Sequence, residues 1–448
     1  MFGIPARHFA RYNEILSVLI RHGLGYMIIS GNLMPMQEEN LAIVGVHLRE
    51  AIGELGPTFI KIGQLASTRS DLLPQPIVEE LAKLQDRVPP LPVGQIRRVV
   101  EESLHARLES IFLEFNPQPL ASASIGQVHQ AVLKTGEKVA VKVQRPFLQG
   151  SVKTDLEIFH VLVNQIERRT QWGKRYPIRM LLEEFSDTIQ KELDFMNEGR
   201  NAEKLASFSK RHSNILIPRI YWELTSPSVL TMEYISGIPL QQIMGSKETS
   251  YHVHQIAVRL SKVILRQILL DGCFHADPHP GNVLILPGEK IAFIDFGITG
   301  HLTPKAKAQI LSLTTALIRG EDTLLLKTLS QMGIIPGDID RQAFKEDISA
   351  LRYKHLKESS RKFVMGESIQ DFFDIIVRHG IYIPSEFFLV GKSLMTLEGV
   401  LNELDPTLSL VEQAMPFSRR FIWARFKFNL RELFPNVFGG LVETDTTV

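Results

Sequence analysis

The stretch His275-Ala276-Asp277-Pro278-His279-Pro280-Gly281-Asn282 decides the fold, together with Ile294-Asp295-Phe296-Gly297 shortly after it. In it an aspartate is followed by an asparagine, and an Asp-Phe-Gly sequence then follows a short apolar segment. This order is typical of sites that transfer phosphoryl groups, where one aspartate orients the acceptor and the later residues bind magnesium. The pattern predicts Asp277 as a catalytic residue. It predicts Asn282 and Asp295 as magnesium ligands, because their oxygen atoms suit a hard cation.

A predicted β-hairpin upstream supplies a lysine for the same site. Residues 127–133 and 138–143 flank the turn Lys134-Thr135-Gly136-Glu137, as paired strands do. In the second strand the valines share one face, so Lys142 points to the other. At such a site the lysine binds the α- and β-phosphates of a nucleotide when a glutamate holds it, and Glu198 on a following helix is the predicted holder.

The segment before this hairpin differs from the glycine-rich loop of ordinary kinases. It reads Pro119-Leu120-Ala121-Ser122-Ala123-Ser124-Ile125-Gly126, with no Gly-x-Gly-x-x-Gly. The Cβ atoms of Ala121 and Ala123 restrict the loop relative to glycine, and this should change how backbone N–H groups meet phosphates.

Two features argue against a peptide substrate. The residue before Asp277 is Ala276 rather than arginine, so no arginine there can bind a phosphorylated activation loop. Only a few residues separate Gly297 from Thr303, after which Pro304 is predicted to begin a helix. That interval is too short for the platform on which protein kinases bind a peptide.

Hydrophobic periodicity divides the rest of the chain. Residues 8 to about 115 are predicted to be helical, with breaks at Gly31-Asn32, Gly56-Pro57 and 88–92. The further predicted elements are helices 152–171 and 178–210, a second hairpin 219–223/229–234, a helix 252–270, strands 283–286 and 291–294, and helices to about 432. The predicted parts are an N-terminal helical extension (1–118), a lobe with a β-hairpin and a helical insert (119–236), a helical lobe (237–415), and a basic-aromatic helix with a polar tail (416–448).

A lysine in the extension forms a further motif, Lys61-Ile62-Gly63-Gln64. On a helix Lys61 and Gln64 share a face. Gly63 inside a helix costs about 1 kcal/mol relative to alanine, which indicates that another surface approaches closely there. An ordinary amphipathic helix is the alternative interpretation.

Two acidic residues, Glu192 and Asp194, precede Glu198. If 178–210 is one helix, Asp194 and Glu198 share a face and Glu192 points away from them. Such carboxylates near a catalytic centre can bind Lys61 or a metal, and a regulatory role is predicted for both. Solvated charge on a helix surface is the alternative.

Composition narrows the class of protein. The chain has 448 residues, a net charge of +1 and one cysteine, Cys273. The balanced charge gives no reason to expect nucleic acid as a partner, and the single cysteine excludes an internal disulfide, as expected on the reducing side of a membrane. No apolar run is long enough to predict a transmembrane helix. Near the N-terminus, Tyr12, Ile15, Leu16, Leu19 and Ile20 predict one face of an amphipathic helix rather than a transit peptide.

Together these motifs resemble those of the UbiB/ABC1/ADCK (AarF-type) family of atypical kinases. The resemblance rests on Lys61-x-Gly63-Gln64, the alanine-containing loop, the hairpin lysine, Glu192-x-Asp194, and the two opening motifs, and it covers about residues 8 to 415. It implies an α+β, protein-kinase-like fold with a small β-containing N-lobe, a helical C-lobe, and an N-terminal helical extension that covers the active site.

The resemblance also implies ligands and roles. It implies a Mg²⁺-dependent ATPase that supports the biosynthesis of ubiquinone or a related quinone, with quinone-precursor lipids and biosynthetic proteins as partners. Lys142 and Glu198 would form the ion pair of the N-lobe, and Lys61 and Gln64 would reach into the site near Glu192 and Asp194. The residues implied to contact ATP are Ala121, Ser122, Ala123, Ser124, Ile125, Gly126, Val128, Lys142, Glu233, Tyr234, Lys61 and Gln64.

The segment 417–431 predicts contact with a membrane surface. Phe417, Phe421 and Phe428 fall on one helical face, and every charged residue from Arg419 to Arg431 is basic. Basic and aromatic faces together are typical of helices that bind anionic lipid. The alternative is a helix docked on the second lobe. The expected location is therefore the cytoplasm, peripheral to the inner membrane, in a bacterium rather than a mitochondrion.

Two other functions keep the same residues. One is phosphotransfer to a small molecule, as in aminoglycoside or choline kinases, against which the occluding extension argues. The other is a non-catalytic scaffold that binds lipid under the control of a nucleotide. A phosphorylated small product would identify the first, and nucleotide binding without hydrolysis would identify the second.

Overall fold

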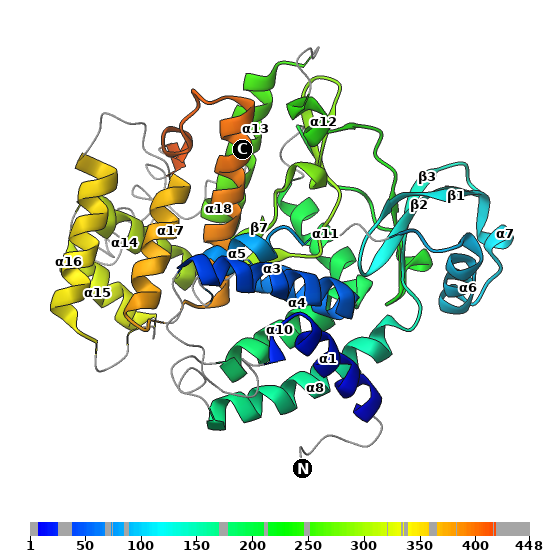
Figure 1. Cartoon of the computed structure of the whole chain (residues 1–448). Coiled ribbons are helices and arrows are strands. Elements are labelled where there is room, and N and C mark those ends of the chain that lie inside the picture. Colours follow the sequence, from blue (N-terminus) through cyan, green and yellow to red (C-terminus); the bar gives the residue numbers. More distant parts are fainter. Residues whose placement is uncertain are drawn as a thin grey trace, which may run out of the picture.

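The computed structural model describes residues 8–25, 38–67, 73, 75–84, 89–169, 178–209, 214–245, 251–319, 321–332, 335, 339–357, 365–381, 383–414 and 416–417. A small β-sheet lobe lies at one side and a larger helical lobe at the other (Figure 1). Helices from the N-terminal region lie across one face between them. Two lobes and an extension are the predicted architecture.

The sheet of the N-lobe has four antiparallel strands in the order β1-β2-β3-β5. These are β1 (Phe112–Ser122), β2 (Gly126–Leu133), β3 (Lys138–Gln144) and β5 (Val229–Glu233). The predicted hairpin is confirmed as β2 and β3. The valine face of β3 is fully buried against Ile96 and Val100 of α6 (Val93–Leu104), which continues through α7 (Leu108–Ile111) into β1. Lys142 is therefore directed away from that core.

Three helices follow β3: α8 (Leu148–Arg169), α10 (Ile178–Glu192) and α11 (Phe195–Ser209). The prediction of one helix over 178–210 is wrong, because the chain breaks between α10 and α11. The Asp194 carboxylate accepts the N–H of Met196 at 3.0 Å and so satisfies a donor that the start of α11 leaves open. Asp194 and Glu198 do not share the face of one helix as predicted.

The second predicted hairpin is only half regular. Residues 229–233 form β5, but the partner segment contains a 3-10 turn, Trp222–Leu224, in place of a strand. Backbone bonds still join the segments, with Tyr221 N–H donating to Thr231 O at 2.9 Å and Glu233 N–H to Arg219 O at 2.8 Å.

The C-lobe holds two small sheets and the helices from α12 onward. Strands β8 (Val283–Leu286) and β9 (Lys290–Phe293) form the predicted pair, flanked by β4 (Ile215–Leu216) and β6 (Ile238–Pro239), while β7 (Cys273–His275) pairs with β10 (Thr299–His301). The helices are α12 (Leu240–Met244), α13 (Val253–Arg266, extended by a π turn to Asp271), α14 (Pro304–Arg319), α15 (Asp322–Gln331), α16 (Arg341–Arg352, extended by a π turn to Lys357), α17 (Met365–Arg378) and α18 (Ser385–Leu404). Pro304 begins a helix, as predicted.

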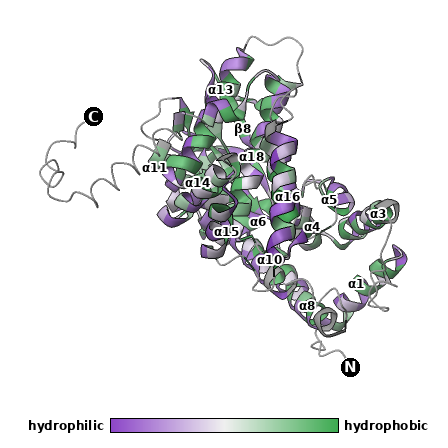
Figure 2. Cartoon of the chain, turned by 90° about the vertical axis from the view of Figure 1, so that its left-hand side faces the viewer, coloured by the Kyte–Doolittle hydropathy of each residue, from purple (hydrophilic) through white to green (hydrophobic). Residues whose placement is uncertain are grey.

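Two apolar cores hold this lobe together. One core joins α11, α13 and α18 to the strands around residues 275–297. The other core joins the helices α14, α15, α16 and α17. Helix α16 buries Phe344, Ile348 and Leu351 on one side, and polar and apolar residues accordingly alternate along the helices in Figure 2. The segments 275–282 and 294–297 thus lie against tightly packed helices.

The extension consists of α1 (Phe9–Arg21), α3 (Glu38–Leu55), α4 (Pro57–Ser67) and α5 (Gln75–Leu81). Gly56 lies between α3 and α4 with a φ of +97°, a conformation that glycine adopts readily, and Pro57 begins α4. In Figures 1 and 2, α3 and α5 lie outside the two lobes on one face. On α1, Tyr12 and Ile15 are buried as predicted, but Ile20 is 52 % exposed.

The predicted membrane segment 417–431 lies outside the described residues except for its first residue. Phe417 packs against the core of the C-lobe, which is the contact of a docked helix. Among the described helices, none combines the length and the apolar character needed to cross a bilayer.

A buried histidine gives the N-lobe a pH dependence. His129 on β2 donates from Nδ1 to Asn116 O at 2.9 Å, so its Nε2, 3.3 Å from the Gln127 amide nitrogen, accepts. Burial lowers the pKa of His129. The unfolded chain then binds a proton near pH 6.5 that the folded chain resists, so the stability present above that pH is lost as the pH falls. We expect urea unfolding of His129→Gln to depend less on pH between 7 and 5 than unfolding of the wild type does. Equal slopes would contradict this.

Candidate active site

The centre of the candidate site is an ion pair between strand β3 and helix α11. Lys142 Nζ on β3 lies 2.8 Å from both carboxylate oxygens of Glu198 on α11. It also lies 5.3 Å from the centroid of the Phe195 ring, and both partners are largely buried. Burial opposes the charge of Lys142, but the carboxylates of Asp295 and Glu198 outweigh it and raise its pKa above the ordinary value. The lysine is therefore held as a cation.

Asp295 of the Asp-Phe-Gly motif faces this pair. Its Oδ2 lies 3.8 Å from Lys142 Nζ, and its Oδ1 accepts the N–H of Gly297 at 2.9 Å. Burial favours the neutral form of Asp295, but the charge of Lys142 and the hydrogen bond from the Gly297 N–H outweigh it and hold the pKa of Asp295 below its usual value. The side chain remains 45 % exposed. Asp295 is thus an ionised carboxylate with access to a ligand.

The neighbouring Phe296 anchors the motif. Its ring is fully buried, and its carbonyl accepts the Asn201 amide of α11 at 3.0 Å.

Residues 275–282 form a loop that partly buried hydrogen bonds connect to Asp295. His275 Nε2 lies 2.6 Å from the Asp295 carbonyl and therefore donates, while Nδ1 accepts the N–H of Asp277 at 3.2 Å. The Asn282 amide donates to Asp277 O at 3.2 Å, and Ile294 N–H donates to Asn282 O at 3.1 Å. The predicted catalytic residue and both predicted metal ligands thus lie in one network, with His275 orienting the loop.

The alanine-containing loop is a tight turn between β1 and β2. Ala121 and Ser122 end β1, and Ala123 N–H donates to Gly126 O at 2.8 Å. Val128, two residues into β2, pairs with Lys142 across the sheet, and Ser124 is buried. Ile125 packs against the same buried cluster, formed by residues of α8 and α10 together with Leu193, as Ile62 and Leu65 of α4 do.

Arg145, just after β3, holds this turn, and the sequence reasoning missed it. Its guanidinium donates to Ala123 O at 2.8 Å, to Ser122 Oγ at 3.0 Å and to Pro89 O at 3.0 Å. The Ser122 hydroxyl, whose direction the sequence left open, therefore contacts Arg145. No pattern in the sequence signals a link of this kind, because it depends on where the turn folds back.

Gly126 is required at the base of the turn. A Cβ there would lie 2.7 Å from the carbonyl oxygen of Val143, which is backbone and cannot move aside cheaply. We expect Gly126→Ala to lower the free energy of unfolding by about 1–3 kcal/mol, the usual cost of overpacking. Gly399→Ala is the matched control, because no atom lies within 4 Å of a Cβ there. It should stabilise α18 by up to about 1 kcal/mol. Equal urea midpoints for the two variants would contradict the expectation.

The extension reaches the site through α4. Lys61 Nζ lies 2.9 Å from Glu192 Oε2, and both side chains are mostly buried. The charge of Glu192 helps to raise the pKa of Lys142, and that of Lys61 helps to lower the pKa of Asp295. A Cβ at Gly63 would meet Leu84 Cδ1 at 2.4 Å, so the predicted close approach is present. Gln64 donates to Leu84 O at 3.4 Å, which places its amide toward the chain after α5.

Residues 233 and 234 connect the lobes after β5. Glu233 pairs with Val139, and its carboxylate accepts the N–H of Arg219 at 3.2 Å. Tyr234 N–H donates to Lys138 O at 3.1 Å. Glu233 is the last residue of β5, the strand that also carries Leu230 opposite Lys142, and Tyr234 continues along the edge of β3.

A lysine far along the chain also joins the site. Lys392 Nζ on α18 lies 3.5 Å from Asp277 Oδ2. The next residue, Ser393, is buried and donates from its hydroxyl to His275 O at 3.0 Å. The sequence analysis missed both residues, because nothing in a helical stretch marks which turn packs on a distant loop.

Comparisons with known proteins agree with this geometry. Residues 83–329 match the model of the ABC1 atypical kinase-like domain, and residues 348–409 match that of the UbiB helical domain. The chain is 31 % identical over 450 residues to the probable protein kinase UbiB of Azotobacter vinelandii, covering 96 % of this chain and 83 % of that one. It is 35 % identical over 378 residues to that of Marinobacter nauticus, covering 83 % and 69 %.

A solved structure supports the fold. The Mycobacterium tuberculosis protein Rv3197, solved in complex with erythromycin, superposes with a TM-score of 0.53 at 23 % identity, covering 79 % of this chain and 90 % of that one. At this identity the likeness concerns the fold, a kinase-like one. The matches to both family models and to the UbiB relatives show that this chain belongs to the ABC1/UbiB family of atypical kinases.

Proposed function

We propose that this protein binds ATP with Mg²⁺ between its lobes and hydrolyses it, in support of quinone biosynthesis. The observation that carries the catalytic part is the convergence of Lys142, Glu198 and Asp295, with 3.8 Å between the lysine nitrogen and the Asp295 carboxylate. Phosphoryl transfer needs positioned phosphates, neutralised charge and an oriented acceptor. In this proposal Lys142 supplies the first, a cation held by Asp295 the second, and Asp277 in the adjoining loop the third.

The donor atoms fit magnesium. The Asn282 amide nitrogen is used in its bond to Asp277 O, which leaves the amide oxygen as the atom to face a ligand. Asp295 keeps Oδ2 for a ligand while Oδ1 accepts a backbone N–H. A hard cation held by these oxygens would neutralise charge on the phosphates.

The remaining residues have distinct tasks in this proposal. Lys142 binds the α- and β-phosphates, and Glu198 keeps it in place. Asp277 orients the attacking water and accepts its proton. The turn at residues 121–126 covers the phosphates, and Glu233 and Tyr234 meet the adenine.

The proposal is tested by nucleotide binding and turnover of the whole chain. We expect ATP to raise the melting temperature with MgCl₂ but much less with EDTA, and purified protein to release phosphate from ATP. Protection without phosphate release, with liposomes and a quinone-precursor analogue present, would replace the ATPase by a nucleotide-gated scaffold. A stoichiometric phosphorylated small molecule would replace it by a small-molecule kinase.

The quinone role rests on the family and on relatives named UbiB. We propose that the protein acts in the cytoplasm at the inner membrane, on or near a lipid precursor and beside quinone-biosynthesis proteins. In this proposal the segment 417–431 contacts the lipid. Deletion of the gene in its host should lower the quinone content, and Asp295→Asn should not restore it. Liposome flotation of a variant with Arg419, Arg420, Lys427 and Arg431 changed to Glu tests the contact, and unchanged flotation would refute it.

A further inference from the structure

The catalytic loop carries no positive charge of its own. From His275 to Asn282 the sequence contains neither lysine nor arginine. The cation nearest to Asp277 in the described part of the chain is Lys392, whose Nζ lies 3.5 Å from Asp277 Oδ2. It comes from α18, in the second family domain rather than the first.

The position of Lys392 is fixed by its neighbours. Ser393 is fully buried and bonds the His275 carbonyl at 3.0 Å, which sets the turn of α18 that faces the loop. Val390 and Leu397, on either side, belong to the same core as Phe274 and Phe296. The side chain of Lys392 is 19 % exposed, and that of Asp277 beside it is 34 % exposed. A buried helix thus presents one partly accessible cation to the site.

The proposed reaction needs a positive charge beside the phosphoryl group that is transferred. When the bond from the γ-phosphorus to the bridging oxygen of ATP breaks, ADP leaves with the electron pair. The water oxygen bonds to phosphorus, and the proton of that water passes to Asp277. Negative charge meanwhile spreads over the oxygens of the transferring group and needs a fixed positive partner. Lys142 is already held by both oxygens of Glu198.

We propose that Lys392 is a further catalytic residue, which binds the transferring phosphoryl group beside Asp277. This inference rests on the proposed ATPase function. It assigns to the helical domain a direct part in the chemistry, in addition to its packing role.

The test uses Lys392→Met, Lys392→Arg and, as a matched control, Lys305→Met, an exposed lysine on α14. We expect Lys392→Met to lower kcat about 100-fold, as loss of one fixed charge-stabilising group does. The dissociation constant of ATP should change far less, and Lys392→Arg should recover part of kcat.

The outcomes separate the two proposals. If the wild type hydrolyses ATP and Lys392→Met does so equally well, this inference fails and the ATPase stands. If kcat falls but Lys392→Arg recovers nothing, Lys392 is only a packing residue. If the wild type binds no Mg²⁺-ATP, the proposed function itself fails.

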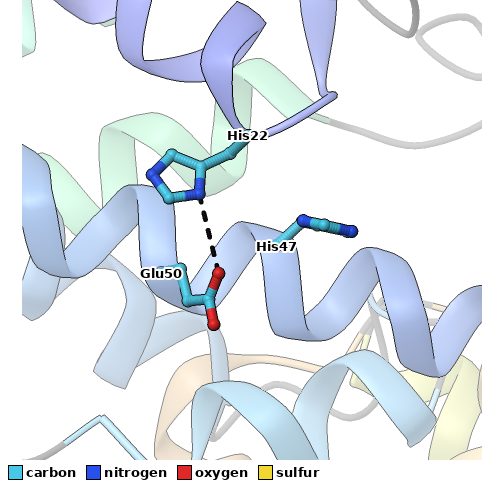
Figure 3. A group of neighbouring side chains, drawn as sticks. All are labelled: His22, His47 and Glu50. Carbon is cyan, nitrogen blue, oxygen red and sulfur yellow. Dashed lines mark ion pairs between the residues drawn. The ribbon is translucent and has the colours of Figure 1, made fainter.

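A second, independent observation concerns three side chains in the extension. His22 follows α1, and His47 and Glu50 are three residues apart on α3 (Figure 3). One possible ligand atom from each lies within 4.8 Å of the others. His22 Nε2 lies 3.0 Å from the Glu54 carboxylate, which in turn accepts from Arg21 at 2.7 Å.

The hydrogen bond to Glu54 uses Nε2 of His22 and leaves Nδ1 to face α3. With Nε2–H donated to Glu54, Nδ1 is the ring nitrogen that faces the Glu50 carboxylate, at 3.7 Å. A histidine whose second nitrogen is held by a carboxylate is the usual arrangement of a metal-bound imidazole.

The geometry points to a site for a divalent transition metal such as Zn²⁺, which would clasp α1 to α3. Tetrahedral bonds of about 2.1 Å put ligand atoms about 3.4 Å apart, so these partly exposed side chains must close by about 1.4 Å at most. Imidazole and carboxylate ligands favour Zn²⁺ over Mg²⁺.

Calorimetric titration with ZnCl₂ tests this site, with His47→Ala as the variant and His252→Ala, an exposed histidine elsewhere, as the control. We expect micromolar binding that falls at least about 10-fold in His47→Ala only, no effect of MgCl₂, and slower hydrogen exchange in α1 with zinc. Equal binding by both variants, or no binding, would rule out a zinc site at His22, His47 and Glu50.

Discussion

Asp295→Asn is expected to remove Mg²⁺-dependent ATP turnover while leaving the fold intact. The change keeps the size of the side chain and its acceptor for the Gly297 N–H, at 2.9 Å in the wild type. It removes the negative charge that faces Lys142 at 3.8 Å and that a magnesium ion would need. Loss of such a charge should lower kcat by about 100- to 1,000-fold.

The measurement is phosphate release, together with the dissociation constant of ATP in MgCl₂ and in EDTA. The two dissociation constants should become similar in Asp295→Asn, since the metal no longer contributes. Asp322→Asn is the matched control, because Asp322 pairs with Arg352 on the far helices of the C-lobe. Turnover in Asp295→Asn close to that of the wild type would sink the proposed function.

Lys142→Met is expected to have the second large effect, on stability as well as on binding. The substitution leaves the Glu198 carboxylate, 5 % exposed, without the cation that lies 2.8 Å from both its oxygens. Breaking a buried ion pair in this way costs about 3–5 kcal/mol, because a charge remains in a dry environment. Nucleotide binding should also be lost, because the contact to the phosphates is gone.

A double variant separates the two effects. In Lys142→Met/Glu198→Gln the unpaired carboxylate at residue 198 is gone, so urea unfolding should recover most of the lost stability while ATP binding stays absent. Lys354→Met, which breaks an ion pair with Asp371 that is 61 % exposed at the lysine, should cost less than about 1 kcal/mol. If the double variant is as unstable as Lys142→Met, the loss comes from packing around the lysine stem.

Much of the architecture follows from local patterns in the sequence. The hairpin of β2 and β3, the start of α14 at Pro304, and the turn at Gly56-Pro57 depend on neighbouring residues and were predictable. The close approach at Gly63 was also predictable, because glycine inside a helix has a cost that packing must offset.

Other features depend on tertiary contacts and were not predictable. The break between α10 and α11 leaves the apolar period almost unchanged, and the irregular segment before β5 keeps strand-like residues while pairing through a few bonds. Arg145 and Lys392 reach the site only because a turn and a distant helix fold back on it. Periodicity finds elements, but it does not tell which side chains meet across them.

The bond between Ser393 and His275 spans 118 residues of chain. A ribosome that has released the residues up to Gly297 has therefore not yet released the helix that donates to the His275 carbonyl. Until that helix emerges, the segment 275–282 of the growing polypeptide lacks this hydrogen bond and the core contacts of α18.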